Sequence, residues 1–425
     1  MSTLLEPVSH TTRTLPKDLR VFCVVSLCAT AAAIVASILG ALELPYPHNA
    51  PFISDRGSAV ADYFAYYQRF HHLHSAAFFT YPGYPYTYLA TGVPLYGFFY
   101  IFGYFGLIIY FIMAAGILLF AFTRVRAALL RRNVHTFSAD GLLAIVFLTS
   151  YPMAFCFERA NLEFFVAAGI ATGNWAYWKQ RTWTAAILWG VFGSVKLYPL
   201  LLLAIFLSFR QIRQFFVSIA AALSASIIAL FYIGPDFHTA IKGIAGSLPA
   251  FLSLYTLRID NLIGFDHSIF ALLKLALLPF KFSMQGMLNI YLITLATTML
   301  TVYVVRIRKL PVANQLLILS ICSVLLPPTS FDYSLLQLYA PFIAIVFVVI
   351  DSSKRLPAMS AAMVLLALMF TPTNFLYSAG DGRSGQIKCV LLIALLVVSL
   401  MRRFPTPALI SSEARLHKMQ LPASK

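Results

Sequence analysis

Long apolar runs recur from one end of this chain to the other. Runs of about 17–25 mostly apolar residues are long enough to cross the ~30 Å hydrocarbon core of a bilayer as an α-helix. Runs close to this length cover residues 21–42, 141–157, 215–233 and 288–305, while 93–122 is longer and 387–401 is slightly shorter. Lipid offers no hydrogen-bond partner to an exposed backbone, so runs of this length cross it as helices. We therefore predict an all-α polytopic membrane protein of about 10–12 transmembrane helices, folded as one integral membrane domain over residues 1–425.

Composition and charge narrow the class further. Of the 425 residues, 60% are hydrophobic and only 11% are charged, a balance that the surface of a water-soluble domain cannot carry. The formal net charge is +16, but the basic residues gather at the ends of apolar spans, which is typical of cytoplasmic loops and argues against a nucleic-acid partner. These clusters are Arg124, Arg126, Arg131 and Arg132; Lys179 and Arg181; Arg210 and Arg213; Arg306, Arg308 and Lys309; Lys354 and Arg355; and Arg402 and Arg403. We expect both termini in the cytoplasm and the functional site on the outer face.

One interval between basic clusters is too short for two complete spans. A helix rises about 1.5 Å per residue, so the chain between Arg181 and Arg210 cannot cross the membrane and return as two full helices. We predict a broken hairpin of two short helices over residues 182–209, with Lys196 at its tip. A lone lysine at membrane depth either lines a polar cavity or is a hydrogen-bonded structural residue, and the sequence leaves both interpretations open.

The first outer segment, over residues 43–92, combines acids with many aromatic residues. If residues 60–70 are helical, Asp62, Tyr66 and Arg69 share one face. On one interpretation Asp62 is a general base at the mouth of a lipid-facing cleft. On the other, the segment is an aromatic belt at the membrane interface with a solvated charge pair. Asp55 precedes Asp62 in the same loop and is a further candidate site residue.

A second outer turn is unusually polar. Glu158, Arg159, Asn161 and Glu163 place two acids, a guanidinium and an amide in one tight turn between apolar spans. Recognition of a sugar explains this group, and so does an internal salt bridge between a glutamate and Arg159 that caps the hairpin. Both hypotheses remain open at this stage.

Two later outer regions carry further candidates. Residues 234–286 contain apolar runs too short to span, such as 268–278, and we expect re-entrant or interfacial helices there. Arg258 lies in this region. Asp332 and Tyr333 follow a Pro-Pro turn, and an acid in so apolar a setting is a functional candidate by default.

The cysteines and clustered histidines do not suggest a metal or redox site. Five cysteines lie in or beside apolar segments without a CxxC pair, as packing residues do: Cys23, Cys28, Cys156, Cys322 and Cys389. Adjacent histidines such as His71 and His72 diverge by about 100° on a helix, and no HExxH spacing is present, so we do not expect these two and His74 to share a metal ion. We expect no metal and no other cofactor.

Several motifs, taken in order, resemble those of the GT-C glycosyltransferases, in particular the family 87 enzymes that use polyprenyl-phosphate mannose. They are ADYFAYY at 61–67, YPGYP at 81–85 leading into PL at 94–95, RANLE at 159–163, VKLYPL at 195–200 and PTSFDY at 328–333. Two positions depart from the family pattern. Gly83 stands where a second proline is common, and Asp332, Tyr333 and Ser334 stand where histidines often follow the aromatic residue.

The resemblance implies a GT-C-like helical bundle and an inverting transfer of a hexose, expected to be mannose, from a polyprenyl-phosphate sugar. The acceptor would be a lipid or glycan at the periplasmic face of a bacterial inner membrane. Under this resemblance Asp62 takes the proton of the acceptor hydroxyl, and Lys196, with Arg159 or Arg258, neutralises the departing lipid phosphate. Sugar or acceptor would contact Asp55, Tyr66, Glu158, Asn161, Asp332 and Tyr333.

Two other functions fit part of the pattern. A lipid or sugar transporter, such as a flippase, also has buried charges and broken helices. It fits less well because the charges concentrate at the outer face and no inverted repeat is visible in the sequence. A ligase or polymerase that uses a diphosphate-linked donor would likewise need positive side chains beside its departing lipid-linked phosphate.

Overall fold

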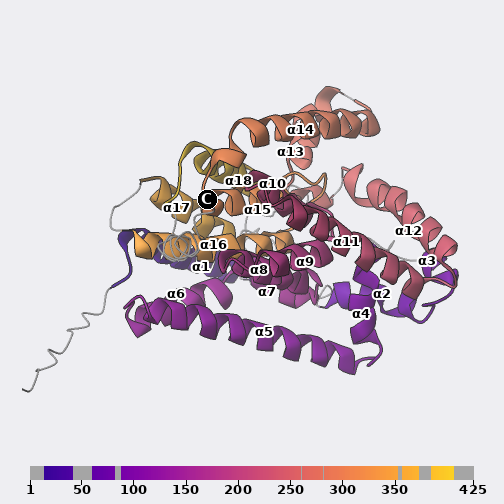
Figure 1. Ribbon diagram of the computed structural model, residues 1–425, viewed down its shortest axis with the longest axis horizontal. Helices are drawn as coiled ribbons and strands as arrows, with labels where there is room; N and C mark the ends of the chain where they lie inside the picture. The colour runs from indigo at the N-terminus through magenta and orange to yellow at the C-terminus, as the bar shows by residue number, and fades with distance from the viewer. Residues whose placement is uncertain are drawn as a thin grey trace, which may run out of the picture.

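The computed structural model describes residues 14–41, 60–81, 88–259, 261–280, 282–352, 357–372 and 384–405. These segments fold into helices joined by turns, without a β-strand (Figure 1). The prediction of an all-α polytopic membrane protein is confirmed by this architecture and by the spans it contains.

Five helical segments of the described chain are long and apolar enough to cross a membrane. They are Lys17–Val35 within α1 (Lys17–Ala41), α5 (Phe105–Leu130), α11 (Ile212–Ile233), Met284–Lys309, which comprises α14 (Met284–Val305) and η5 (Ile307–Lys309), and Asp332–Asp351, which comprises η6 (Asp332–Leu338) and α16 (Tyr339–Asp351). Shorter apolar helices accompany them, among them α15 (Val312–Leu325), α17 (Pro357–Phe370) and α18 (Ser384–Met401). The expected total of about 10–12 crossings stays a prediction.

A sixth span is broken in the middle. α6 (Thr136–Phe147) and α7 (Tyr151–Arg159) pass the same test together but meet at an angle of 49°. Pro152 lies in the first turn of α7, where the missing N–H of a proline costs no helical hydrogen bond. In one unbroken helix through α6 and α7 the same proline would lie in the interior, where it would bend or end the helix. Ser150 bridges the break by donating from Oγ to the carbonyl of Val146 at 2.7 Å. Arg159 is the last residue of α7, beyond the bend.

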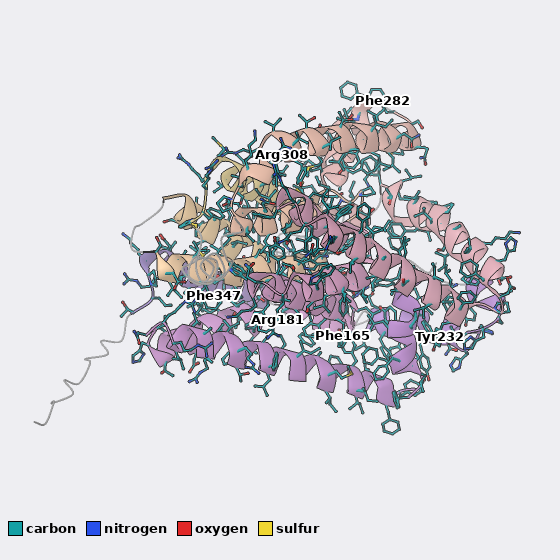
Figure 2. The ribbon with its side chains drawn as sticks, viewed as in Figure 1. Phe165, Arg181, Tyr232, Phe282, Arg308 and Phe347 are labelled. Atoms are coloured by element: carbon teal, nitrogen blue, oxygen red, sulfur yellow. The ribbon has the colours of Figure 1, made fainter. Side chains whose placement is uncertain are left out.

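The bundle has a buried centre and lipid-facing edges. Residues 313–325 of α15 are all buried, whereas α5 and α14 run along opposite edges (Figure 1). Only 17% of the apolar window of α5 and 11% of that of Met284–Lys309 is buried within the protein. Figure 2 shows the same contrast in side chains: Phe165 packs inside, while Phe282 projects from the edge beside α14 and is 54% exposed.

Small residues allow the central helices to approach closely. Gly169 and Gly173 of α8 (Glu163–Trp178) lie directly against Phe192 and Trp189 of α9 (Thr182–Gly193). A Cβ at either glycine would come within 2.5 Å of those rings. Small residues four positions apart are typical of helix contacts in membranes, where helices associate through close packing and not through the hydrophobic effect.

Short elements surround the functional residues. After α9, the chain forms an irregular turn that carries Lys196 and then continues as η1 (Tyr198–Leu203) and α10 (Ala204–Ser208). Three further helices precede α5: α2 (Ala61–Phe70), α3 (Ala77–Thr80) and α4 (Gly92–Tyr100). The region after α11 folds as α12 (Phe237–Phe251), a π-helical turn η2 (Leu252–Thr256), η3 (Asn261–Phe265), α13 (Ile269–Leu277) and η4 (Leu278–Phe280). Their position at the membrane surface stays a prediction.

Candidate active site

The start of α2 is held against the end of α7. Val60 adopts a left-handed conformation (φ 52°) before the first turn of α2, and its amide donates to the carbonyl of Glu158 at 2.6 Å. Asp62 lies in that first turn. This local contact explains why an acid from the first outer segment meets the polar turn at 158–163.

Asp62 is bound by two side chains of that turn. Arg159 donates to Asp62 Oδ1 from Nη2 at 2.9 Å and from Nε at 3.2 Å, and Asn161 donates from Nδ2 to Asp62 Oδ2 at 2.6 Å. Ala160 between them has a left-handed backbone (φ 49°) that ends α7, so that its neighbours on both sides reach Asp62. A carboxylate has about four lone-pair sites, and this one remains 19% exposed, so a further group can reach it.

Asn161 connects Asp62 to a second ion pair. Its Oδ1 accepts from the amide of Glu163 at 2.8 Å and from Tyr88 Oη at 3.2 Å. Tyr110 Oη donates to the backbone carbonyl of Asn161 at 2.8 Å. Burial raises the pKa of the Tyr88 phenol well above its usual value, so this hydroxyl stays protonated and keeps donating. The amide of Asn161 is therefore fixed in one orientation.

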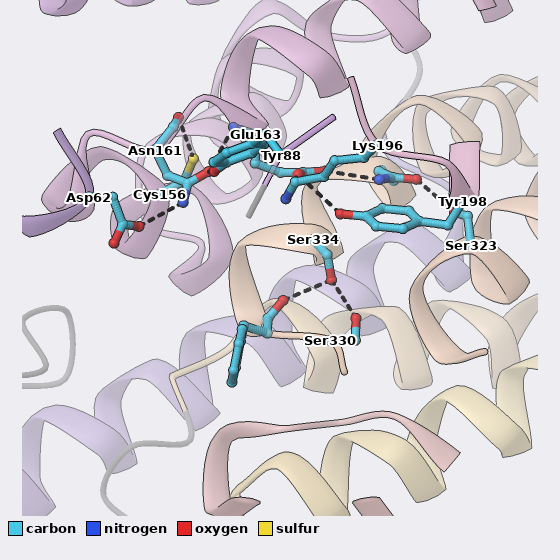
Figure 3. A network of polar contacts seen from close by, with 12 residues as sticks. Asp62, Tyr88, Cys156, Asn161, Glu163, Lys196, Tyr198, Ser323, Ser330 and Ser334 are labelled. Atoms are coloured by element: carbon cyan, nitrogen blue, oxygen red, sulfur yellow. Dashed lines mark hydrogen bonds and ion pairs between the residues drawn. The ribbon is translucent and has the colours of Figure 1, made fainter. Parts of the chain in front are cut away.

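The second ion pair joins Lys196 to Glu163. Lys196 Nζ donates to Glu163 Oε2, and Gln337 donates from Nε2 to Glu163 Oε1 at 2.9 Å (Figure 3). The Glu163 side chain is fully buried, whereas that of Lys196 is 12% exposed. Ser323 Oγ donates in turn to Gln337 Oε1 at 2.6 Å. Hydrogen bonds thus link Asp62 through Asn161 and Glu163 to Lys196, with Glu163 bound through its backbone amide on one side and its carboxylate on the other.

Aromatic rings enclose the ammonium of Lys196. Its Nζ lies 4.8 Å from the ring centre of Tyr333, 5.1 Å from that of Tyr88 and 5.7 Å from that of Tyr198. Tyr333 is held parallel to Phe155, with ring centres 6.1 Å apart. Ring faces attract a cation, so they stabilise the charged lysine where water is scarce.

A separate buried cluster surrounds Asp332. Its carboxylate lies 2.7 Å from Lys388 Nζ and 3.6 Å from Nδ1 of His267, and all three side chains are at most 1% exposed. His267 Nε2 is within hydrogen-bonding distance of Ser330 Oγ and Ser334 Oγ, at 3.0 and 3.2 Å. Asp332 therefore faces this cluster, while its neighbour Tyr333 faces Lys196.

The remaining predicted residues lie at different depths. Tyr66 is buried, with its ring centre 6.1 Å from that of Tyr88. Glu158 is half-buried, and Arg258 is exposed just after η2, where Lys274 Nζ donates to its backbone carbonyl at 3.2 Å. Asp55 lies outside the described residues. The structure thus brings together Asp62, Arg159, Asn161, Lys196 and Tyr333, and it places the carboxylate of Asp332 against Lys388 and His267.

Several residues of these networks were not among the candidate site residues, and three of them bind or pair with the buried charges: Glu163, Gln337 and Lys388. Glu163 stood out in the polar turn, but nothing in the sequence paired it with Lys196. Gln337 and Lys388 were not singled out, although a lysine at the start of the apolar run 387–401 is itself a signal of function or pairing. Within the described segments, no group of three or more His, Cys, Asp or Glu side chains is arranged to hold a metal ion.

This geometry supplies two complementary chemical groups. A partly accessible carboxylate can accept a proton, and a cation in a partly desolvated setting can stabilise negative charge far better than it would in water. Together they suit a displacement in which a hydroxyl attacks and an anionic group departs.

Comparison with known proteins gives the family. No curated protein and no solved structure matches the chain. The model of glycosyltransferase family 87 matches residues 81–331, a stretch that contains Arg159, Asn161, Glu163 and Lys196 but begins after Asp62 and ends before Asp332. Because this match covers more than half of the chain, the protein belongs to glycosyltransferase family 87 and is a membrane glycosyltransferase of the GT-C type.

Proposed function

We propose that this glycosyltransferase moves a hexose, most simply mannose, from a polyprenyl-phosphate carrier to a hydroxyl of a lipid or glycan acceptor. The observation that carries the proposal is the continuous network from Asp62 to Lys196, which puts a base and a cation into one site. Family membership supports the sugar donor and acceptor as substrate classes.

The proposed step is a single displacement with inversion at the anomeric carbon. The acceptor oxygen forms a bond to that carbon while the bond from the carbon to the phosphate oxygen breaks. The bonding electrons leave with the lipid phosphate, and the acceptor's proton moves to the carboxylate of Asp62. Lys196 stabilises the charge that develops on the phosphate. Arg159 donates hydrogen bonds to Asp62. These bonds favour a role for Arg159 in orienting the base over a role in contacting the phosphate directly.

Other parts of the site would contact the sugar and acceptor. Tyr333, Tyr66 and Asn161 line or adjoin the network, and their rings and amide suit the apolar faces and hydroxyls of a sugar. The location that we propose is a bacterial inner membrane. The basic clusters at the ends of the spans support an orientation with both termini in the cytoplasm and this site on the periplasmic side. No metal is needed for charge stabilisation when a lysine supplies it.

The test replaces Asp62 with asparagine, which removes the base at nearly constant volume. Asp62→Asn should lower kcat by a factor on the order of 10³ or more, in line with the 10²–10⁴-fold worth of a positioned base. Asp140→Asn is the matched control, because it breaks another Asp–Arg pair, with Arg126 at 2.5 Å, outside the site. Turnover by Asp62→Asn at the level of that control would refute the general-base role.

The same purified protein decides the donor class. Polyprenyl-phosphate mannose should serve as donor, and a polyprenyl-diphosphate sugar should not. Transfer from the diphosphate donor alone would replace the proposed function with that of a diphosphate-dependent ligase.

A further inference from the structure

Glu163 occupies a place that the proposed mechanism does not explain. Its carboxylate is fully buried and accepts hydrogen bonds from Lys196 and Gln337, with Tyr198 Oη at 3.5 Å. The cation that should meet the donor phosphate is therefore already paired with an acid. A simple phosphate-binding lysine would not need such a partner at its side.

The two members of this pair differ in freedom. Glu163 lies in the first turn of α8, its amide is bound by Asn161, and Gln337 is itself held by Ser323. Lys196 lies in the irregular turn between α9 and η1 and remains partly exposed. If a second anion enters, Lys196 can turn toward it, while the carboxylate of Glu163 stays where it is.

The charges of the network are balanced before any substrate binds. Asp62 pairs with Arg159, and Glu163 pairs with Lys196. A lysine shared between Glu163 and a phosphate holds that phosphate less tightly than an unpaired lysine would, because the fixed carboxylate of Glu163 repels the phosphate at short range. The repulsion grows as the sugar leaves, since a phosphodiester carries one negative charge and a phosphate monoester carries about 1.5–2 at neutral pH.

We propose that Glu163 is the counter-ion that Lys196 exchanges for the donor phosphate, and that its fixed negative charge limits the affinity for the departing lipid phosphate and so speeds its release. This inference rests on the proposed function, because it requires Lys196 to meet a lipid phosphate. It makes Glu163 a positioning residue that tunes product affinity through Lys196. The competing account is that Glu163 only neutralises a buried lysine.

The experiment measures inhibition by polyprenyl phosphate that carries no sugar, using purified full-length protein in lipid nanodiscs. Glu163→Gln keeps the shape of the side chain and one of its two acceptor oxygens but removes the charge. The inhibition constant of polyprenyl phosphate should fall about tenfold, as expected for the loss of one nearby charge in a partly desolvated site. The KM for the donor should fall less, and kcat should fall because product release becomes slower.

Two further variants keep the inference falsifiable. Glu163→Asp retains the charge but draws it back from Lys196, so the inhibition constant should fall part of the way even if Glu163→Gln does not fold. Asp351→Asn is the control for loss of an acid paired elsewhere, since Asp351 pairs with Arg132 at 2.7 Å; it should leave the inhibition constant unchanged. Folding of each variant is checked by its thermal unfolding transition.

The outcomes separate the two levels of the argument. If wild-type protein transfers the sugar but the glutamate variants bind polyprenyl phosphate no more tightly than wild type, the role of Glu163 is overturned and the proposed function stands. If wild-type protein neither transfers from the monophosphate donor nor is inhibited by polyprenyl phosphate, the proposed function itself fails.

Discussion

Gln337 donates from Nε2 to Glu163 Oε1 at 2.9 Å, across 174 residues of chain. The contact joins η6, beyond the end of the family match, to the first turn of α8, within it. Ser323 of α15 binds the other end of the Gln337 amide. The C-terminal half of the chain therefore helps to hold the acid that pairs with Lys196.

Replacing Gln337 tests this relationship. Gln337→Ala leaves a buried carboxylate oxygen without its donor, and a hydrogen bond to a charged group contributes about 1.5–3 kcal/mol. We expect a lower thermal unfolding temperature and a changed KM for the donor. Gln285→Ala is the control, because Gln285 makes an exposed hydrogen bond to Asn289 at 3.1 Å. Equal unfolding temperatures for the two variants would contradict the importance of the buried contact.

Asn161 should affect catalysis more than donor binding. Asn161→Ala removes the donor to Asp62 Oδ2 and the acceptor that holds the Tyr88 hydroxyl. A base that is free to rotate is poorly placed for proton transfer, so kcat should fall by roughly 10–100-fold, as losses of positioning do, with a smaller change in donor KM.

A second buried asparagine provides the control for that prediction. Asn174 accepts a hydrogen bond from Trp189 Nε1 at 3.0 Å on the contact between α8 and α9. Asn174→Ala should lower the unfolding temperature yet leave kcat of the folded fraction close to wild type. If both variants lose kcat to the same extent per degree of destabilisation, Asn161 acts through folding alone.

Much of the fold, and part of the site, could be predicted from the sequence. Apolar run length predicts helices and spans directly, because the bilayer leaves a chain few alternatives. The short helix predicted after Ser268 is confirmed as α13, with Ser268 as its N-cap. The helix over residues 60–70, which the sequence raised only as a condition, is present as α2.

Pairing across long sequence separations could not be predicted in the same way. A lysine at residue 196 and an acid at residue 163 each stand out, but their meeting depends on how α8, α9 and the following turn pack. The neighbours Asp332 and Tyr333 illustrate the limit, since the backbone of η6 sends them to different clusters. Without the register of η6, both residues look like members of one site.

The cap of α12 gives a prediction about pH. Asp236 accepts hydrogen bonds from the amide and the hydroxyl of Thr239 at 2.8 and 2.7 Å, and these bonds hold the pKa of the Asp236 carboxyl below its usual value of about 3.8. Its stabilisation of α12 is therefore present above that usual value and is lost as the pH falls through the lower folded-state pKa.

Hydrogen exchange measures this effect at the Thr239 amide. In wild-type protein, protection of that amide should hold at pH 5 and above and weaken as the pH falls below about 3.8, the unfolded-state value. Asp236→Ala should lose the protection at all of these pH values, since it has no carboxylate to accept the bond. Protection in Asp236→Ala equal to that in wild type would show that the cap does not hold the helix end.

Close packing of α9 should control the placement of Lys196. A Cβ added at Gly190 would lie 2.3 Å from the backbone carbonyl of Ser218 on α11, so Gly190→Ala forces the two helices apart. Such overpacking costs about 1–3 kcal/mol, and it displaces the helix that ends just before the turn carrying Lys196. We expect a lower unfolding temperature together with a raised KM for the donor.

Gly116→Ala is the control, because a Cβ there meets nothing within 4 Å on a lipid-facing helix, and alanine favours a helix by about 0.5–1 kcal/mol. If Gly190→Ala were as stable and as active as Gly116→Ala, α9 could shift without moving Lys196, and the position of that lysine would have to be set by Glu163 and the surrounding rings alone.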